Sequence, residues 1–158
     1  MIVTDPSELA AALNKGERLF GLDLGEKTIG IALSDVMLSV ATPFETIARR
    51  KFSVDAETLI ALIKKHSVGG LVVGLPLNMN GTEGPSAQSA RAFVRNFLAK
   101  HNLPVLFWDE RLSTAAVTRT LIEADVSRAK RKDAVDKMAA SFILQGVLDF
   151  LTRKNAHP

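Results

Sequence analysis

The stretch RLFGLDLGEKTIGIALS, residues 18–34, decides the fold of this chain. Residues 18–24 and 29–34 are each apolar enough for a strand, and Gly25-Glu26-Lys27 between them predicts a hairpin turn. Asp23 interrupts the first apolar strand, where a charged group is costly to bury unless it is paired or bound to a metal. An aspartate at a strand end also commonly caps a turn. The hairpin therefore leaves two roles open for Asp23, structural and functional.

Further elements extend in both directions from this hairpin. Upstream, Asp5-Pro6-Ser7-Glu8 has the residue order of a helix start. Downstream, residues 40–47 predict a third strand, which Pro43 makes irregular or places at an edge. The remaining sequence predicts a helix on Ala56, Leu59, Ile60 and Ile63, a strand at 69–75, a helix on Ala90, Phe93, Val94 and Phe97, a strand at 105–108, and helices near 113–124 and 134–153.

This order of elements predicts the fold class. An antiparallel hairpin unit that leads into strand–helix–strand crossovers gives a mixed sheet with helices on both faces. We expect an α/β protein with five strands, in the layout of the ribonuclease H-like fold. The length of 158 residues predicts a single domain, 1–158, in which residues 1–17 form an N-terminal helical extension.

The composition is that of an ordinary globular protein, with 47% hydrophobic and 23% charged residues. The chain has no cysteine, which excludes disulfides and thiolate metal sites and fits a reducing compartment. No apolar run reaches the ~18 residues of a membrane span, and the N-terminus has no secretory signal pattern. We expect a cytoplasmic protein without a membrane partner. The net charge of +3 slightly favours an anionic partner such as nucleic acid.

Acidic residues occur at three separated places that the fold would bring together. Asp23 ends one strand, Asp109-Glu110 ends another, and Asp133 and Asp136 share one face of the last helix. Sites gather at the carboxyl ends of parallel strands, and a divalent cation removes the repulsion between clustered carboxylates. Mg²⁺ suits such oxygen ligands, and two ions would clamp a phosphodiester displacement. The ordinary alternatives are a pairing of Glu110 with Arg111, and a favourable helix-dipole position for Asp133.

Two loops could contact phosphates. Arg128, Lys130, Arg131 and Lys132 form a basic run, expected to be a loop at 127–132, which either grips nucleic acid or is solvated. The loop at 78–85, with Asn78, Asn80 and Gly81, precedes a helix start, and its backbone N–H groups could receive a phosphate. It lacks the Walker A pattern. A third cluster, residues 49–51, is expected to be solvated.

Four ordered stretches resemble the YqgF family, whose members are Holliday-junction-resolvase-like or pre-16S rRNA processing nucleases. The resemblance covers nearly all of residues 18–152. It is carried by GLDLGEKTIGIALSD (21–35), VVGLPLNMNGTEGPSAQSARAFV (72–94), WDERLSTAAV (108–117) and VDKMAASFILQGVLDFL (135–151).

The resemblance implies a ribonuclease H-like fold with a nuclease site that uses Mg²⁺ or Mn²⁺. It assigns the catalytic and metal-binding acids to Asp23, Glu110 and Asp136, while Asp133 matches only loosely. The family often has a basic residue where this chain has Thr28, so Lys27 could supply that contact to nucleic acid. Arg111 of the D-E-R motif and the basic run are the other expected contacts.

The function that the resemblance implies is cleavage of structured RNA at the 5′ end of pre-16S rRNA. A Holliday junction resolvase acting on branched DNA has the same chemistry, and a stable homodimer rather than a monomer would favour it. A third reading is a non-catalytic nucleic-acid-binding factor in ribosome maturation or transcription. The sequence itself does not choose between RNA and DNA.

Overall fold

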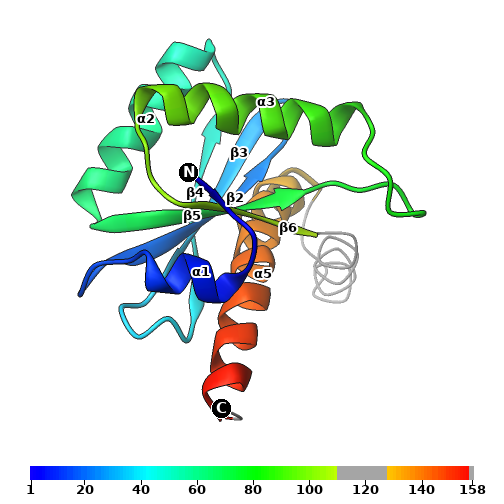
Figure 1. Ribbon diagram of the computed structural model, residues 1–158. Helices are drawn as coiled ribbons and strands as arrows, with labels where there is room; N and C mark the ends of the chain where they lie inside the picture. The colour runs from blue at the N-terminus through cyan, green and yellow to red at the C-terminus, as the bar shows by residue number, and fades with distance from the viewer. Residues whose placement is uncertain (110–127, 157–158) are drawn as a thin grey trace.

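The computed structural model describes residues 1–109 and 128–156, and within the second range the side chains of 137–154. It has three layers, with one sheet between helices on either face (Figure 1). The elements are β1 (Ile2–Val3), α1 (Pro6–Ala11), β2 (Arg18–Leu24), β3 (Thr28–Ser34), β4 (Ala41–Ala48), α2 (Phe52–Lys65), β5 (Val68–Leu75), α3 (Pro85–Lys100), β6 (Val105–Asp109) and α5 (Arg128–Ala156).

The sheet has six strands in the order β1-β6-β5-β2-β3-β4. Strand β2 pairs antiparallel with β3, which confirms the predicted hairpin, and β5 pairs parallel with both β2 and β6. The five predicted strands are present, but the count of five is wrong by one. The additional strand β1 pairs with β6 and has only two residues, too few for a periodic pattern to indicate it.

Local sequence signals account for the chain's start and its edge strand. The Asp5 carboxylate accepts a hydrogen bond from the Glu8 N–H at 3.0 Å, which caps α1 as predicted. Strand β4 lies at the sheet edge, and the β3–β4 register shifts where Ala32 pairs with Pro43. Proline lacks the N–H that a central strand would need, so both features follow from Pro43.

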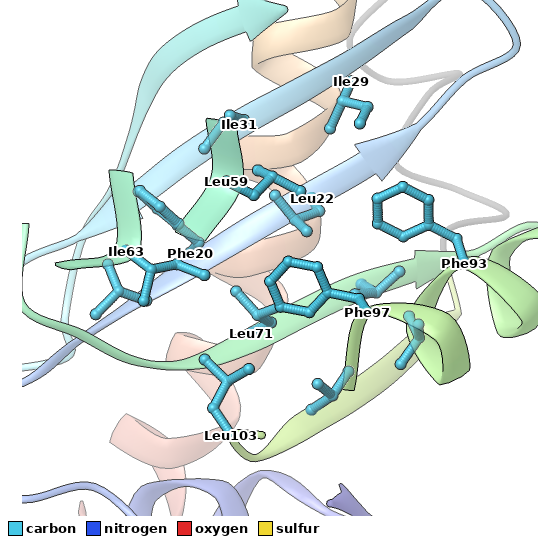
Figure 2. Close-up of a cluster of buried hydrophobic side chains, with 14 of the residues drawn as sticks. Phe20, Leu22, Ile29, Ile31, Leu59, Ile63, Leu71, Phe93, Phe97 and Leu103 are labelled. Atoms are coloured by element: carbon cyan, nitrogen blue, oxygen red, sulfur yellow. The ribbon is translucent and has the colours of Figure 1, made fainter. Parts of the chain in front are cut away.

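The two faces of the sheet are covered by separate cores. Helices α2 and α3 cover one face with an aromatic-rich cluster that includes Phe20, Phe93 and Phe97 (Figure 2). On the other face, α5 packs on Leu19, Val72 and other aliphatic residues.

One predicted boundary is wrong. The basic run at 128–132 was expected in a loop, whereas α5 already begins at Arg128. Lysine, arginine and alanine all favour helix, and the run contains neither glycine nor proline, so nothing in it stops the helix. The helix expected near 113–124 lies outside the described residues. Within the described part, no helix is long and apolar enough to span a membrane.

Candidate functional site

Asp23 lies near the carboxyl end of β2, half-buried, and pairs across the hairpin with Gly30. Its neighbour Leu22 belongs to the core under α2 and α3. Two residues back, a Cβ on Gly21 would lie 2.7 Å from the Ala140 carbonyl oxygen, so this side of β2 faces α5. Because side chains alternate along a strand, Asp23 shares the α5 face with Gly21.

Helix α5 runs antiparallel to β2. The Gln145 Oε1 accepts a hydrogen bond from the Ala41 N–H at 2.8 Å, and Ala41 pairs with Ser34. The Ser34 hydroxyl in turn accepts from the Leu19 N–H at the start of β2. Gln145 therefore lies level with the beginning of β2, and the earlier turns of α5 lie toward the end that carries Asp23.

A glycine separates Asp23 from an aromatic side chain on the same face. The parallel register that pairs Leu22 with Val73 places Asp23 level with Gly74, which pairs with Trp108 of β6. The Trp108 ring lies on the α5 side, because a Cβ on Gly146 would be 2.7 Å from its Nε1. Gly74 is buried and adds no side chain between Asp23 and Trp108.

Asp109 lies on the opposite face from Asp23. The preceding alternation is clear, since Phe107 packs against the aromatic core and lies 4.8 Å from the Arg91 guanidinium, whereas Trp108 faces α5. Asp109 is exposed and pairs with Leu75. Of the acids in the described strands, only Asp23 therefore occupies the α5 face at this edge.

Most of the predicted site falls outside the side chains that the structure describes. Two of its residues, Glu110 and Arg111, lie outside the described ranges. For six others in α5 the structure describes the backbone but not the side chains: Arg128, Lys130, Arg131, Lys132, Asp133 and Asp136. Across the described part of the chain, no three acidic or histidine side chains gather as a metal site. The assignment of these acids as ligands accordingly stays a prediction.

Lys27 is exposed at the tip of the β2–β3 turn, beside the Asp23 end of the sheet. The turn is fastened by Arg49, whose backbone N–H donates to the Lys27 carbonyl at 2.8 Å and whose Nη1 donates to the Gly25 carbonyl at 2.7 Å. The Arg49 Nε lies 4.0 Å from the buried Asp55 carboxylate. The expectation that residue 49 is merely solvated is wrong. A run of three basic residues gives no signal of which one is bound.

The loop that was expected to receive a phosphate satisfies part of its own hydrogen bonding. The N–H groups of Asn78 and Gly81 donate to the carbonyls of Thr82 and Asn78, each at 2.8 Å. The Thr82 N–H donates to the Asn80 side chain at 3.1 Å. These three donors are engaged in the structure, so a phosphate there would have to displace them or use other groups.

A bidentate ion pair fixes the same loop to α3. The Arg91 guanidinium donates to both Glu83 carboxylate oxygens, at 2.7 and 2.8 Å. These hydrogen bonds lower the pKa of the Glu83 carboxyl and raise the pKa of Arg91. The ion pair thus holds the loop in place after β5, at the carboxyl ends of the strands, where Asp23 also lies.

Known proteins resemble this chain over nearly its whole length. The family described as "RuvX: Holliday junction resolvase" matches residues 17–150. A protein of Paramagnetospirillum magneticum with the name "Putative pre-16S rRNA nuclease" is 58% identical over 149 residues, which are 94% of this chain and 96% of that protein. A protein of the same name from Sphingopyxis alaskensis is 58% identical, over 97% of this chain and 100% of that protein.

Two solved structures of resolvases have a similar fold at low sequence identity. The RuvC of T. thermophilus, in complex with a Holliday junction substrate, has a TM-score of 0.55 at 13% identity and covers 86% of this chain and 96% of its own. The yeast mitochondrial Holliday junction resolvase Ydc2 has a TM-score of 0.52 at 13% identity, over 94% of this chain and 85% of its own. These likenesses confirm the ribonuclease H-like fold.

Proposed function

The chain belongs to the RuvX family, and from this premise we propose that it is a nuclease that hydrolyses phosphodiester bonds with the help of Mg²⁺ or Mn²⁺. The observation that carries the proposal is the position of Asp23. Its carboxylate stands at the carboxyl end of the parallel strands, on the face that α5 approaches to backbone contact. In open α/β sheets, ligand-binding sites form at the carboxyl ends of the parallel strands.

Asp136 is the proposed partner of Asp23 across the gap between sheet and helix. It precedes Ala140 by one helical turn, a rise of about 6 Å. Asp23 follows Gly21 by two strand residues, about 6.6 Å. Because Ala140 contacts Gly21 and α5 is antiparallel to β2, both steps lead in the same direction from one point of contact. Position 136 is therefore expected beside Asp23.

Glu110, which follows the last residue of β6 in the sequence, is the proposed third acid. Leu106 and Trp108 both pack toward α5, so a further step of two along the strand would return position 110 to the face of Asp23. Asp133, one further turn along α5 from Asp136, is an additional candidate ligand. Carboxylate oxygens in this number suit a hard divalent cation, which prefers oxygen donors and keeps several waters.

The chemistry divides between the cation and the chain. A bound cation would polarise the phosphodiester and supply a nucleophilic water. The chain's carboxylates would fix its position on the face of the sheet where Gly74 adds no side chain beside Asp23. Lys27, Arg111 and the basic residues Arg128, Lys130, Arg131 and Lys132 are the proposed phosphate contacts, and Asn78, Asn80 and Gly81 could position a further phosphate.

We propose that the substrate is structured RNA at the 5′ end of pre-16S rRNA, because the relatives at 58% identity bear that name. Branched DNA is the second candidate, because the family description names Holliday junction resolvases. A resolvase cuts two strands symmetrically, so a homodimer would favour DNA, whereas a monomer would favour RNA.

The test is cleavage of end-labelled RNA that spans the 16S 5′ boundary, with a four-way DNA junction in parallel. Reactions would contain Mg²⁺, Mn²⁺ or EDTA. We expect Asp23→Asn and Asp136→Asn to reduce cleavage by at least about 100-fold, since metal stabilisation of the transition state is worth several kcal/mol. The melting temperatures should remain close to that of the wild type.

Asp109→Asn is the matched control, because it removes a carboxylate from the same sheet edge but from the opposite face. It should cleave like the wild type. If Asp109→Asn and Asp23→Asn lose activity equally, the assignment of the α5 face as the site is wrong. Binding of RNA without cleavage in any metal would instead support the non-catalytic factor.

A further inference from the structure

The outer face of α3 carries positive and polar side chains without any acid. Its 16 residues include no aspartate or glutamate. The exposed residues of α3 include Ser86, Ser89, Arg95, Asn96 and Lys100. The helical repeat puts Ser89, Asn96 and Lys100 on one stripe, and Arg95 lies about a third of a turn from it on the same solvent-facing side. Cations, hydroxyls and amides are the groups with which proteins contact nucleic-acid phosphates. This face, defined here as the α3 track, has the composition of a backbone-binding surface.

The cations of the α3 track are available to a ligand. Arg95 and Lys100 form no ion pair or side-chain hydrogen bond with any described residue. Arg91 of the same helix differs, because Glu83 neutralises it and its guanidinium lies over the Phe107 ring. Arg91 therefore has a structural role within the protein, whereas Arg95 is exposed to solvent.

An open basic cleft continues the α3 track at the far end of the sheet. It has a volume of about 740 Å³, and its lining includes Lys15, Lys64 and His101. Glu17, the acid of this lining, accepts a hydrogen bond from the Asn14 N–H at 2.7 Å. Lys15 and Lys64 have no ion pair within the described ranges. His101 of this lining directly follows Lys100, so the cleft lies next to the end of the α3 track.

Helix dipoles explain only part of this arrangement. Lys64 and Lys100 lie in the last turns of α2 and α3, where cations stabilise the negative helix ends. Arg95 lies more than one turn before the end of α3, and Lys15 is in the connection between α1 and β2. Neither position benefits from a helix end, so the helix dipoles do not account for these two cations.

We propose that the α3 track and the cleft bind the phosphodiester backbone of the RNA substrate beyond the cleaved bond. The proposal rests on the proposed nuclease function and adds a second contact surface to it. Helix α3 begins after the loop that follows β5, at the carboxyl ends of the strands, and ends near their amino ends (Figure 1). Because Asp23 faces α5 and α3 covers the other face, the RNA would pass around the carboxyl ends of the strands to reach the track. The helix length of about 24 Å would carry the RNA from the carboxyl ends toward the amino ends.

The experiment measures RNA binding by the intact protein in EDTA, so that cleavage does not interfere, at several salt concentrations. The variant Arg95→Gln/Lys100→Gln removes two cations. We expect the slope of log affinity against log salt to fall by about 1.4 to 1.8, the values for two phosphate contacts to a single strand and to a duplex. Arg95→Glu/Lys100→Glu should weaken binding further, by about tenfold or more at 0.1 M salt.

The matched control is Arg153→Glu/Lys154→Glu, which changes the net charge equally in the last turn of α5. It should bind RNA nearly as the wild type does. Equal losses for the control and the α3 variants would show a general charge effect and overturn the proposal. A loss of affinity for a four-way DNA junction, with RNA binding unchanged, would overturn the choice of RNA.

The outcome is separable from that of the proposed function. If wild-type protein binds RNA but never cleaves it when Mg²⁺ or Mn²⁺ is added, the nuclease proposal fails. The comparison between the α3 variants and the α5 control still decides whether the track binds RNA. If the wild-type protein cleaves RNA and the α3 variants keep the wild-type RNA affinity and its salt dependence, the nuclease proposal is supported and the proposed role of the α3 track is wrong.

Discussion

The two faces of the sheet are packed by different means. Under α2 and α3, large aromatic rings fill the space between helices and sheet. The ring centroids of the stacked Phe93 and Phe97 are 6.4 Å apart, and those of Phe20 and Phe44 are 5.7 Å apart. Under α5, glycines let the helix and the sheet pack closely together. A Cβ on Gly21 or Gly146 would lie 2.7 Å from an atom across the interface.

This difference assigns the main stabilising core to one face and the proposed site to the other. Rings hold a helix at a distance and bury much apolar area, which stabilises the fold. A contact of helix backbone with strand backbone buries less per residue but shortens the gap between them. Short acidic side chains on both elements can then approach one another. The α5 face thus has the close packing that the proposed metal site needs, and the aromatic face forms a core.

The largest change in stability is expected from Phe97→Ala, on the aromatic face. Phe97 is buried against Phe93, and its removal should reduce the free energy of unfolding by about 3–5 kcal/mol. Urea unfolding would measure this loss. Cleavage per folded molecule should remain unchanged, because α5 and β2 keep their contact. A decrease in that specific rate would show that the two faces are not independent.

Gly21→Ala, on the α5 face, should reduce stability less than Phe97→Ala does but should reduce the cleavage rate more. The added methyl group would overlap with the Ala140 carbonyl and the Leu144 Cβ, a strain of about 1–3 kcal/mol. Because relief of this strain moves α5 away from β2, cleavage should fall by more than the loss of folded protein explains. Urea unfolding and cleavage rates on the same samples would compare the two.

Gly70→Ala controls for overpacking on the same face. Its Cβ would meet the flexible ends of Leu19 and Leu9 at 3.0 Å, near the start of β5 and away from Asp23. It should lose some stability but no specific activity. If Gly70→Ala reduces the cleavage rate as much as Gly21→Ala, the distance between β2 and α5 does not control the site.

Sequence patterns predicted the two faces unequally. The apolar strands and the helical spacing of Phe93 and Phe97 give strong periodic signals, so the aromatic face was predictable. The contact of Gly21 with Ala140 joins segments that are far apart in the sequence, so no periodic pattern identifies this particular pair. The Arg49 contact with Gly25 was missed for the same reason, since it joins segments that no local pattern relates. The acids at 110 and 136 stay predictions of sequence and family.

The smallest expected effect concerns the β3–β4 turn, on which α5 is docked through the hydrogen bond from Gln145 Nε2 to the Ser39 carbonyl. Partial burial opposes ionisation of Asp35, but hydrogen bonds from Ser39 and Val40 outweigh it and lower its pKa below the ordinary 3.8. A lowered carboxyl pKa stabilises the fold above pH 3.8, and this contribution is lost as the pH falls through the folded-state value. Asp35 is largely solvated, so the contribution is about 0.5 kcal/mol. Urea unfolding should show Asp35→Asn less stable than wild type at pH 6, with a smaller difference at pH 3. A constant difference at both pH values would mean that the charge of Asp35 has no part in holding this end of the α5 face.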